Sequence, residues 1–469
     1  MKSRPSSVGL GLLLAALACR NAPKQLASGL SVASLAAPSS LLRFPSAGGI
    51  AQIYRDPSLV ESGWKSQGPL PPVRRVLGAD LDQDVVYAFG AKNEIMTLDL
   101  QTGKVRQNLL GKVRDAAIGP DGTLFTVDDS NVVTQVVHRN PIRFQARLPG
   151  APSDLFGTKD DRMVAIASGA GNAITQVGTA EQATTIMLPR GDAAATFWGD
   201  LIAVAADTAV ILFEPQVKSK PQSIAVSGHA RAVMFSPSGH RLYVARRDAP
   251  VLILNRFTGE ELGQLTLPGP AGSMRADPFG RWMLVHPSAA DSVWVVDLAT
   301  RKLVGSFATE WGADLPTVTD QQTLVLRHGD DVVGYDLTKP ELPRTGVVTG
   351  GGHDFWAALA WTPETGTSVP TSVVAAADTT PADSGTGAAA RPAPVYLQIS
   401  SSQNPTWADE LAKQLAGAGL PASVLKPGAP DEGYRVVLGP YATREEAEAS
   451  GRKLGRPFFI YQPDRSTDH

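Results

Sequence analysis

The sequence predicts a multidomain protein in which a large all-β region precedes a small α+β domain. Its 469 residues allow two or three domains with sizeable cores. The chain contains 45 Gly and 36 Pro but only 19% charged and 6% aromatic residues, a composition typical of short strands joined by turns. A four-beat pattern recurs about every forty residues between positions 76 and 352, and a mixed strand and helix pattern begins at position 395.

The charge balance and the single cysteine exclude several classes of function. The 43 basic and 45 acidic residues leave a net charge of −2, so the chain lacks the basic excess that nucleic-acid binding needs. One cysteine cannot form an intramolecular disulfide, a CxxCH haem attachment, an iron–sulfur cluster or a multi-cysteine zinc site. We therefore expect no cofactor, no metal site and no nucleic-acid partner.

Residues 1–18 predict a secretory signal peptide, because a basic start precedes an apolar run, Val8–Ala18, that is too short to cross a bilayer. The run ends immediately before Cys19, which suits either ordinary signal peptidase or lipidation of the cysteine. Ala16 occupies the position where a lipobox usually has Leu. We expect lipidation, because the only cysteine of the chain lies at this position, and we expect residues 19–48 to form a tether.

The four-beat pattern is clearest between residues 230 and 267. There, turn residues separate the runs Ala230–Phe235, His240–Ala245, Val251–Asn255 and Leu262–Leu267. Copies of this pattern start near residues 76, 115, 153, 193, 230, 273 and 315. A four-stranded sheet cannot bury both faces alone, but radial packing of such sheets buries them against each other. Residues 49–363 are therefore predicted to form a seven-bladed β-propeller, with six or eight blades as alternatives.

The repeat resembles the YVTN and WD40-like propeller families in its turns and strand pattern. Asp354–Trp361 or Gly49–Tyr54 is expected to close the ring. His229 followed by Asp248 resembles the structural His–Asp pair of WD40 blades. Metal-ligand histidine spacing, a nucleophile elbow, a P-loop and a dinucleotide fingerprint are all missing from the sequence. We therefore predict no catalytic residues and expect the propeller to be a binding or scaffold surface, although propellers host enzymes too.

Two different segments follow the predicted propeller. Residues 364–394 are rich in Thr, Ala, Ser, Gly and Pro and lack aromatic residues, which predicts a disordered linker. Residues 395–469 show a β-α-β-β-α-β pattern, typical of a small α+β domain with an RNP-like, four-stranded antiparallel sheet. We expect both helices to cover one face of this sheet and to leave the other face free.

The pattern of the C-terminal segment is similar to that of the SPOR (sporulation-related repeat) domain. The resemblance rests on Leu397–Ser401, on Ala408 and Leu411 of the first helix, and on Tyr434–Tyr441, whose Gly-Pro-aromatic turn precedes the second helix. It covers nearly all of residues 395–462. The resemblance implies binding of peptidoglycan, with a preference for glycan strands that lack stem peptides and accumulate at division septa.

Strand alternation predicts where such a glycan would bind. If Leu397 and Ile399 face the helices, then every second residue of this strand and of the strand that begins at Tyr434 lies on the open face. Amide, hydroxyl and guanidinium groups beside an aromatic ring suit an uncharged sugar polymer. The candidate peptidoglycan-binding residues are Tyr396, Gln398, Ser400, Ser401, Arg435, Val437 and Tyr441.

These observations together predict an exported bacterial envelope protein, periplasmic, anchored to the outer membrane through a lipid on Cys19 and located at the septum. Its SPOR domain would bind peptidoglycan, and its propeller would present a scaffold to other envelope proteins in cell division or envelope organisation. The alternative is a propeller enzyme, a hydrolase or lyase of envelope polysaccharide that the SPOR domain targets. A convergent polar cluster at one mouth of the central channel would favour the enzyme.

Overall fold

The computed structural model describes residues 39–363 and 394–461 with short internal gaps. The gaps are 81–82, 108–109, 121, 138–139, 159–162, 169–171, 178–183, 189–190, 198, 216–219, 237–238, 278–280, 320, 360, 403–404, 418, 429–432 and 454–457. The predicted signal peptide, Cys19, most of the predicted tether and nearly all of the predicted linker lie outside the described residues.

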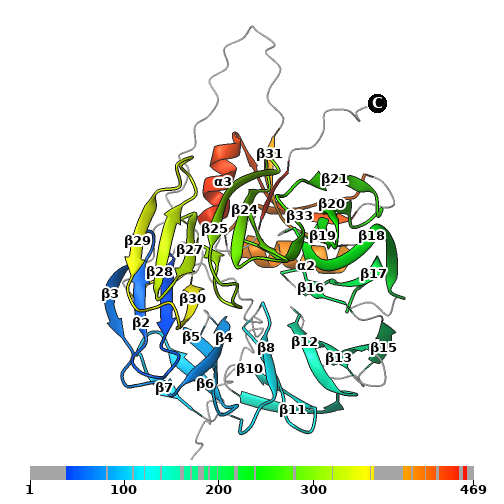
Figure 1. Ribbon diagram of the computed structural model, residues 1–469. Helices are drawn as coiled ribbons and strands as arrows, with labels where there is room; N and C mark the ends of the chain where they lie inside the picture. The colour runs from blue at the N-terminus through cyan, green and yellow to red at the C-terminus, as the bar shows by residue number, and fades with distance from the viewer. Residues whose placement is uncertain are drawn as a thin grey trace, which may run out of the picture.

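Antiparallel sheets surround a common centre in the larger part of the molecule, which confirms the predicted propeller (Figure 1). Five of the sheets have four strands in chain order, and the first strands of three successive sheets contact one another. These sheets are β4 (Val73–Asp80), β5 (Val85–Gly90), β6 (Ile95–Asp99) and β7 (Val105–Arg106); β8 (Asp115–Ile118), β9 (Leu124–Val127), β10 (Val132–Val137) and β11 (Asn140–Arg147); β12 (Ala151–Gly157), β13 (Met163–Ser168), β14 (Asn172–Val177) and β15 (Thr184–Leu188); β22 (Ala271–Ala276), β23 (Trp282–Pro287), β24 (Ser292–Asp297) and β25 (Lys302–Ala308); and β26 (Thr317–Val318), β27 (Thr323–His328), β28 (Asp331–Asp336) and β29 (Arg344–Val348).

A sixth sheet has six strands and combines two of the predicted repeats. Its strands are β16 (Ala193–Ala195), β17 (Ile202–Phe213), β18 (Gln222–Phe235), β19 (Arg241–Arg246), β20 (Ala249–Asn255) and β21 (Glu261–Leu265). The long strands β17 and β18 each contain a residue with positive φ, Asp207 and Gly228, and their pairing is interrupted between Asp207 and Ala209. We therefore count each long strand as two, one on each side of this point. The sheet then consists of two four-stranded units.

The last sheet closes the ring with strands from both ends of the described propeller. Its strand order is β3-β2-β1-β30, with β1 (Ser40–Phe44), β2 (Gln52–Arg55), β3 (Val60–Lys65) and β30 (Phe355–Leu359). The described residues thus form eight four-stranded units, and eight is one of the two alternatives to the seven predicted. The predicted boundary at residue 49 is also too late, because β1 lies within the predicted tether. The segment SLLRF is buried on both faces, so it shows no strand alternation.

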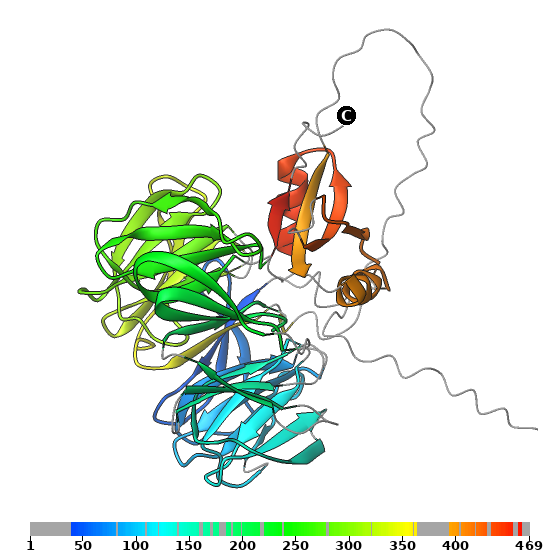
Figure 2. The same ribbon diagram turned by 90° about the vertical axis from the view of Figure 1, so that its right-hand side faces the viewer.

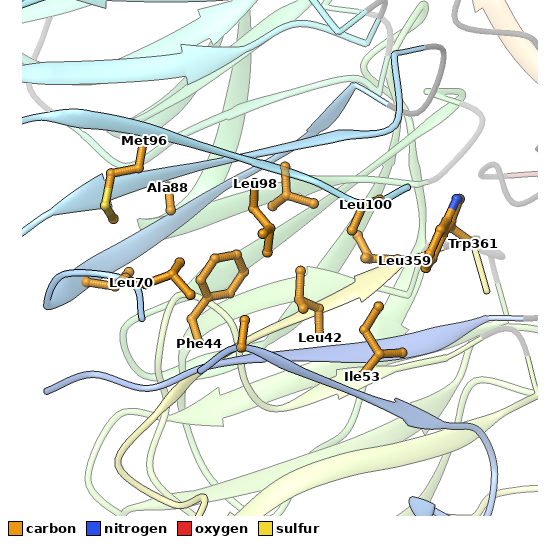
Figure 3. Close-up of a cluster of buried hydrophobic side chains, with 13 residues drawn as sticks. Leu42, Phe44, Ile53, Leu70, Ala88, Met96, Leu98, Leu100, Leu359 and Trp361 are labelled. Carbon is orange, nitrogen blue, oxygen red and sulfur yellow. The ribbon is translucent and has the colours of Figure 1, made fainter. Parts of the chain in front are cut away.

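Hydrophobic clusters between neighbouring sheets form the core of the propeller. Figure 3 shows the cluster in which Leu42 and Phe44 of the closing sheet contact Met96 and Leu98 of the adjacent sheet. Trp361, which follows β30, belongs to the same cluster. Side chains from two sheets thus exclude water from each interface, which is how radial packing buries both faces of a narrow sheet.

The C-terminal part forms the predicted β-α-β-β-α-β domain. Its elements are β31 (Val395–Ser402), α2 (Pro405–Gly417), β32 (Ala422–Leu425), β33 (Tyr434–Tyr441), α3 (Arg444–Lys453) and β34 (Phe459–Tyr461), and the sheet order is β32-β33-β31-β34. Leu397, Val436 and Leu438 of the sheet pack with Leu411 and Leu415 of α2. Within the described part of the chain, no helix combines the length and apolar character needed to span a membrane.

The two views place the C-terminal domain against one face of the ring, beside the sheet that contains β19 to β21 (Figures 1 and 2). A hydrogen bond between Arg256, which follows β20, and Ser401 of β31 joins the two parts. The C-terminal sheet therefore has a neighbour on each face: its own helices on one side and the propeller on the other.

Candidate functional site

The face of the C-terminal sheet that points away from the helices carries most of the candidate residues. In the pairing of β31 with β33, Gln398 lies opposite Val437 and Ser401 lies opposite Arg435. Directly paired residues project from the same side of a sheet. Val437 is fully buried but is not part of the cluster formed with the helices, so its burial comes from the other side. Gln398, Ser401, Arg435 and Val437 thus share this face.

An irregularity in β31 separates Ser400 from this group. The register shifts between Gln398 and Ser400, so Ser400 pairs with Val436, a residue of the helix-side core. One extra residue in a strand moves each later side chain to the opposite face. The alternation predicted for Ser400 is therefore wrong, and Ser401 takes the expected position. Whether either serine binds glycan stays a prediction.

The two candidate tyrosines lie in different surroundings. Tyr396 pairs with Tyr461 of β34, and both rings are half-buried. Tyr441 packs against the helix-side core, and burial raises the pKa of its hydroxyl. The structure therefore does not bring Tyr441 together with Gln398 and Arg435.

Two residues that the sequence reasoning missed complete the polar face. The Arg435 guanidinium lies 5.0 Å from the centre of the Tyr461 ring, within range of a cation–π interaction. Arg444, at the start of α3, lines the same cavity as Arg435. Alternation along β34, which pairs Tyr461 with Tyr396, was a signal that could have identified the tyrosine.

The propeller covers part of this face, so the prediction that it is free is wrong. The Arg256 Nη2 atom donates a hydrogen bond of 2.7 Å to the Ser401 carbonyl oxygen. The Phe257 ring approaches Gly433 so closely that it leaves no room for a Cβ atom on Gly433. Gln398 and Ser401 are 1% and 0% exposed. No local sequence signal marks such a contact, because its two sides are about 145 residues apart.

A cavity of about 290 Å³ remains at this junction. It is lined by His240 and Arg241 of the propeller and by Gln398, Arg435, Arg444, Ile460 and Tyr461 of the C-terminal domain. Burial, together with the positive charges of Arg435, Arg241 and Arg256, lowers the pKa of His240 to about 3. The imidazole is therefore neutral at physiological pH.

The propeller centre and its histidines bear on the enzyme alternative. His229 Nδ1 lies 2.8 Å from Asp207 Oδ1, so its partner is not the Asp248 expected from the sequence. Asp154 and Asp192 occur at the first strands of neighbouring units, and burial raises the pKa of both carboxyl groups, with Asp115 adding repulsion at Asp154. Among the described residues, no three His, Cys, Asp or Glu side chains are placed to hold a metal ion.

Comparison with protein families identifies the C-terminal domain. Residues 392–460 match the model of the SPOR domain. This region of the chain is thus a SPOR domain, a peptidoglycan-binding module found in bacterial envelope proteins. No curated protein sequence matches the chain.

Comparison with solved structures identifies the larger region as a propeller. Apo AztD from Citrobacter koseri superposes with a TM-score of 0.52 at 11% identity, covering 70% of this chain and 100% of that one. A second crystal structure of AztD from Citrobacter koseri gives 0.51 at 11% identity, with 69% and 98% covered. Dihydro-heme d1 dehydrogenase NirN in complex with DHE gives 0.50 at 13% identity, with 70% and 74% covered. At such low identity these likenesses show the fold alone.

Proposed function

We propose that this envelope protein binds peptidoglycan glycan strands lacking stem peptides, and that it does so at the septum, in cell division or envelope organisation. In this proposal a lipid on Cys19 anchors the protein to the outer membrane, and the propeller presents a scaffold to other envelope proteins. One observation carries the proposal: the segment that matches the SPOR domain presents an amide, a hydroxyl and an arginine-stacked aromatic ring on one sheet face.

The chemistry of this face supports a sugar ligand. The Gln398 Nε2 and Ser401 Oγ atoms are buried, and neither has a hydrogen-bond partner among the residues that the structure describes. Sugar hydroxyl and acetamido groups would supply such partners, because they both donate and accept hydrogen bonds. The rings of Tyr396 and Tyr461 lie on neighbouring strands and offer surfaces on which a pyranose ring can stack. An uncharged polymer also suits a chain whose net charge is only −2.

Co-sedimentation with purified sacculi tests the proposal. We expect the protein to sediment with sacculi, and to bind more after an amidase has removed the stem peptides. The double variant Gln398→Ala, Arg435→Ala should bind at least about tenfold more weakly, because it loses one neutral and one charge-assisted hydrogen-bonding group. Lys413→Ala, an exposed change on the helix side, is the control. Equal sedimentation of the double variant and the wild type would contradict the proposed site.

The enzyme remains the second candidate because two carboxyl groups at the first strands of neighbouring propeller units have raised pKa. Such groups in a cleft can act as general acids. Asp154 and Asp192 are the candidates, since burial raises the pKa of both. In the sedimentation experiment, release of soluble glycan fragments that Asp154→Asn abolishes would support the enzyme. Intact sacculi after prolonged incubation would support the scaffold.

A further inference from the structure

We propose that the propeller competes with glycan for the same face of the SPOR sheet, so that the protein binds peptidoglycan only after its two parts separate. The proposal rests on the proposed function and adds its regulation. We call His240, Arg241, Arg256 and Phe257 the docking surface. It belongs to the unit that contains β19, β20 and β21.

The docking surface contacts the glycan-binding candidates themselves. Arg256 donates its hydrogen bond to the carbonyl group of Ser401, and His240 and Arg241 line a cavity together with Gln398 and Arg435. Gln398, Ser401 and Val437 are buried to at least 99%. A glycan chain cannot reach these side chains while the propeller is docked.

The docking unit departs from the other propeller units at the residues that make this contact. After the third strand, three other units have a buried leucine at the same position, namely Leu100, Leu298 and Leu337. In each of them the leucine N–H donates to the carbonyl of the residue that precedes the second strand, and Arg256 N–H makes the equivalent bond to His240. The docking unit therefore has an arginine where these three units have a core leucine.

The next position shows the same departure. Gln101, Ala299 and Thr338 follow the three leucines, and all of them are exposed. Phe257 occupies this position in the docking unit but is only 7% exposed, because the SPOR domain covers it. A buried leucine followed by an exposed residue is thus replaced by an Arg-Phe pair in the unit that contacts the SPOR domain, which indicates a surface built for this contact.

The propeller positions Arg256 for its role. Its guanidinium is fully buried, which lowers its pKa, and the carboxylates of Asp200 and Glu214 offset this effect. The guanidinium also lies 4.0 Å from the centre of the Phe257 ring. These neighbours stabilise a buried charge that would otherwise be costly. They hold Nη2 toward the carbonyl of Ser401.

The contact is suited to exchange with another ligand. Four polar atoms at the junction lack a hydrogen-bond partner among the described residues: Gln398 Nε2, Ser401 Oγ, His240 Nδ1 and Arg256 Nε. An unpaired buried polar atom is unfavourable, so the docked state forgoes hydrogen bonds that water or a sugar could supply. A glycan that satisfies Gln398 and Ser401 can therefore displace the propeller.

The double variant Arg256→Leu, Phe257→Ala tests the proposal. It introduces the pair that another unit has at these positions, Leu298-Ala299, and is therefore expected to fold. Binding of a fluorescent amidase-treated glycan fragment is measured by anisotropy, and the dimensions of the protein by small-angle X-ray scattering. We expect the variant to bind the fragment about tenfold or more tightly, because in the wild type part of the binding free energy is used to separate the SPOR domain from the propeller. We also expect a larger radius of gyration than in the wild type.

The control is Gln101→Ala, which changes the equivalent exposed position of another unit and should match the wild type in both measurements. Unchanged affinity in the double variant would overturn the competition. Weaker binding would overturn it too and show that the propeller contributes to the glycan site. If no form of the protein bound the fragment, the proposed function would fail. Scattering would still test docking, because an equal radius of gyration in the double variant and the wild type would show that Arg256 and Phe257 do not hold the two parts together.

Discussion

Arg327 is a buried positive charge that joins the last two sheets of the ring. Its Nη2 atom lies 3.0 and 2.8 Å from the two carboxylate oxygens of Asp314, and its Nε atom donates to the Gly352 carbonyl at 2.7 Å. Asp314 in turn accepts the backbone N–H of Trp356 in β30 at 2.8 Å. The pair therefore ties β27 to the closing strand, with both side chains about one-tenth exposed.

Removal of this arginine should destabilise the protein strongly. Arg327→Ala leaves the Asp314 carboxylate buried without its partner, so we expect the free energy of unfolding to fall by about 3–5 kcal/mol. Urea denaturation followed by circular dichroism measures the change. Lys302→Ala, at an exposed position, should change the free energy by less than about 0.5 kcal/mol. A loss of similar size in the two variants would show that the buried pair does not stabilise the ring.

At the scale of single residues, the candidate site was only partly predictable. The positions of Gln398, Arg435 and Val437 follow from alternation, which depends only on local strand geometry. The placement of Ser400 failed because a register shift depends on the partner strand, which the sequence of β31 does not reveal. Arg256 was missed because its role depends on a domain contact distant in sequence.

Among the elements, strand β1 is essential to the closing sheet, although it lies within the segment predicted to be a tether. Strand β1 pairs with β2 on one side and with β30 on the other. Its residues Leu41, Leu42 and Phe44 are completely buried. Each fully buried side chain of this size contributes about 1.5–3 kcal/mol, so the strand contributes an amount comparable with the whole stability of an ordinary domain.

Truncation tests this role of β1. A chain that begins at residue 49 lacks the strand, and we expect it to lose its cooperative thermal transition, because β2 and β30 are left with unpaired edges. A chain that begins at residue 39 keeps the strand and is the matched control. Circular dichroism during heating compares the two. If the shorter chain melted within a few degrees of the longer one, β1 would be dispensable.

The repeats could be predicted because each unit carries its own turn residues. All seven predicted starts fall within two residues of the first strand of a unit, since Gly, Pro and Asp mark the same turns in each copy. Asp354–Trp361 was expected to close the ring and does so through β30, but the eighth unit was not counted because its strands come from opposite ends of the propeller. Only long-range pairing, such as that of Leu42 with Ala357, joins them.

For the molecule as a whole, docking makes the arrangement of the two parts sensitive to pH. The neutral His240 lies among Arg241, Arg256 and Arg435, with Arg444 lining the same cavity. Separation of the parts removes Arg435 and exposes the imidazole, so its pKa rises from about 3 toward the ordinary 6.5. The undocked state therefore takes up a proton below about pH 6.5, and the docked state does not. The equilibrium constant for docking is highest above this pH and falls by up to about tenfold for each pH unit below it.

Small-angle scattering between pH 7.5 and pH 5 measures this effect. We expect the radius of gyration of the wild type to increase as the pH falls, while His240→Gln, which cannot gain a proton, stays nearly constant. Arginines keep their charge in this range, and Glu214, whose pKa burial raises, is present in both proteins. The same pH profile in both proteins would assign the effect to a group other than His240.

The pairing of β1 with β30 also determines how the protein responds to tension. Ser40 at the start of β1 pairs with Leu359 at the end of β30, and the Ser40 hydroxyl donates to the Trp361 carbonyl at 2.5 Å. The chain thus enters and leaves the ring at one point. If a lipid anchors the N-terminus as proposed, and the SPOR domain has left the docking surface and holds the cell wall, a pull between the two ends would be carried by this pairing of β1 with β30. Such a pull would break the hydrogen bonds between β1 and β30 one after another, beginning at the pair Ser40 and Leu359.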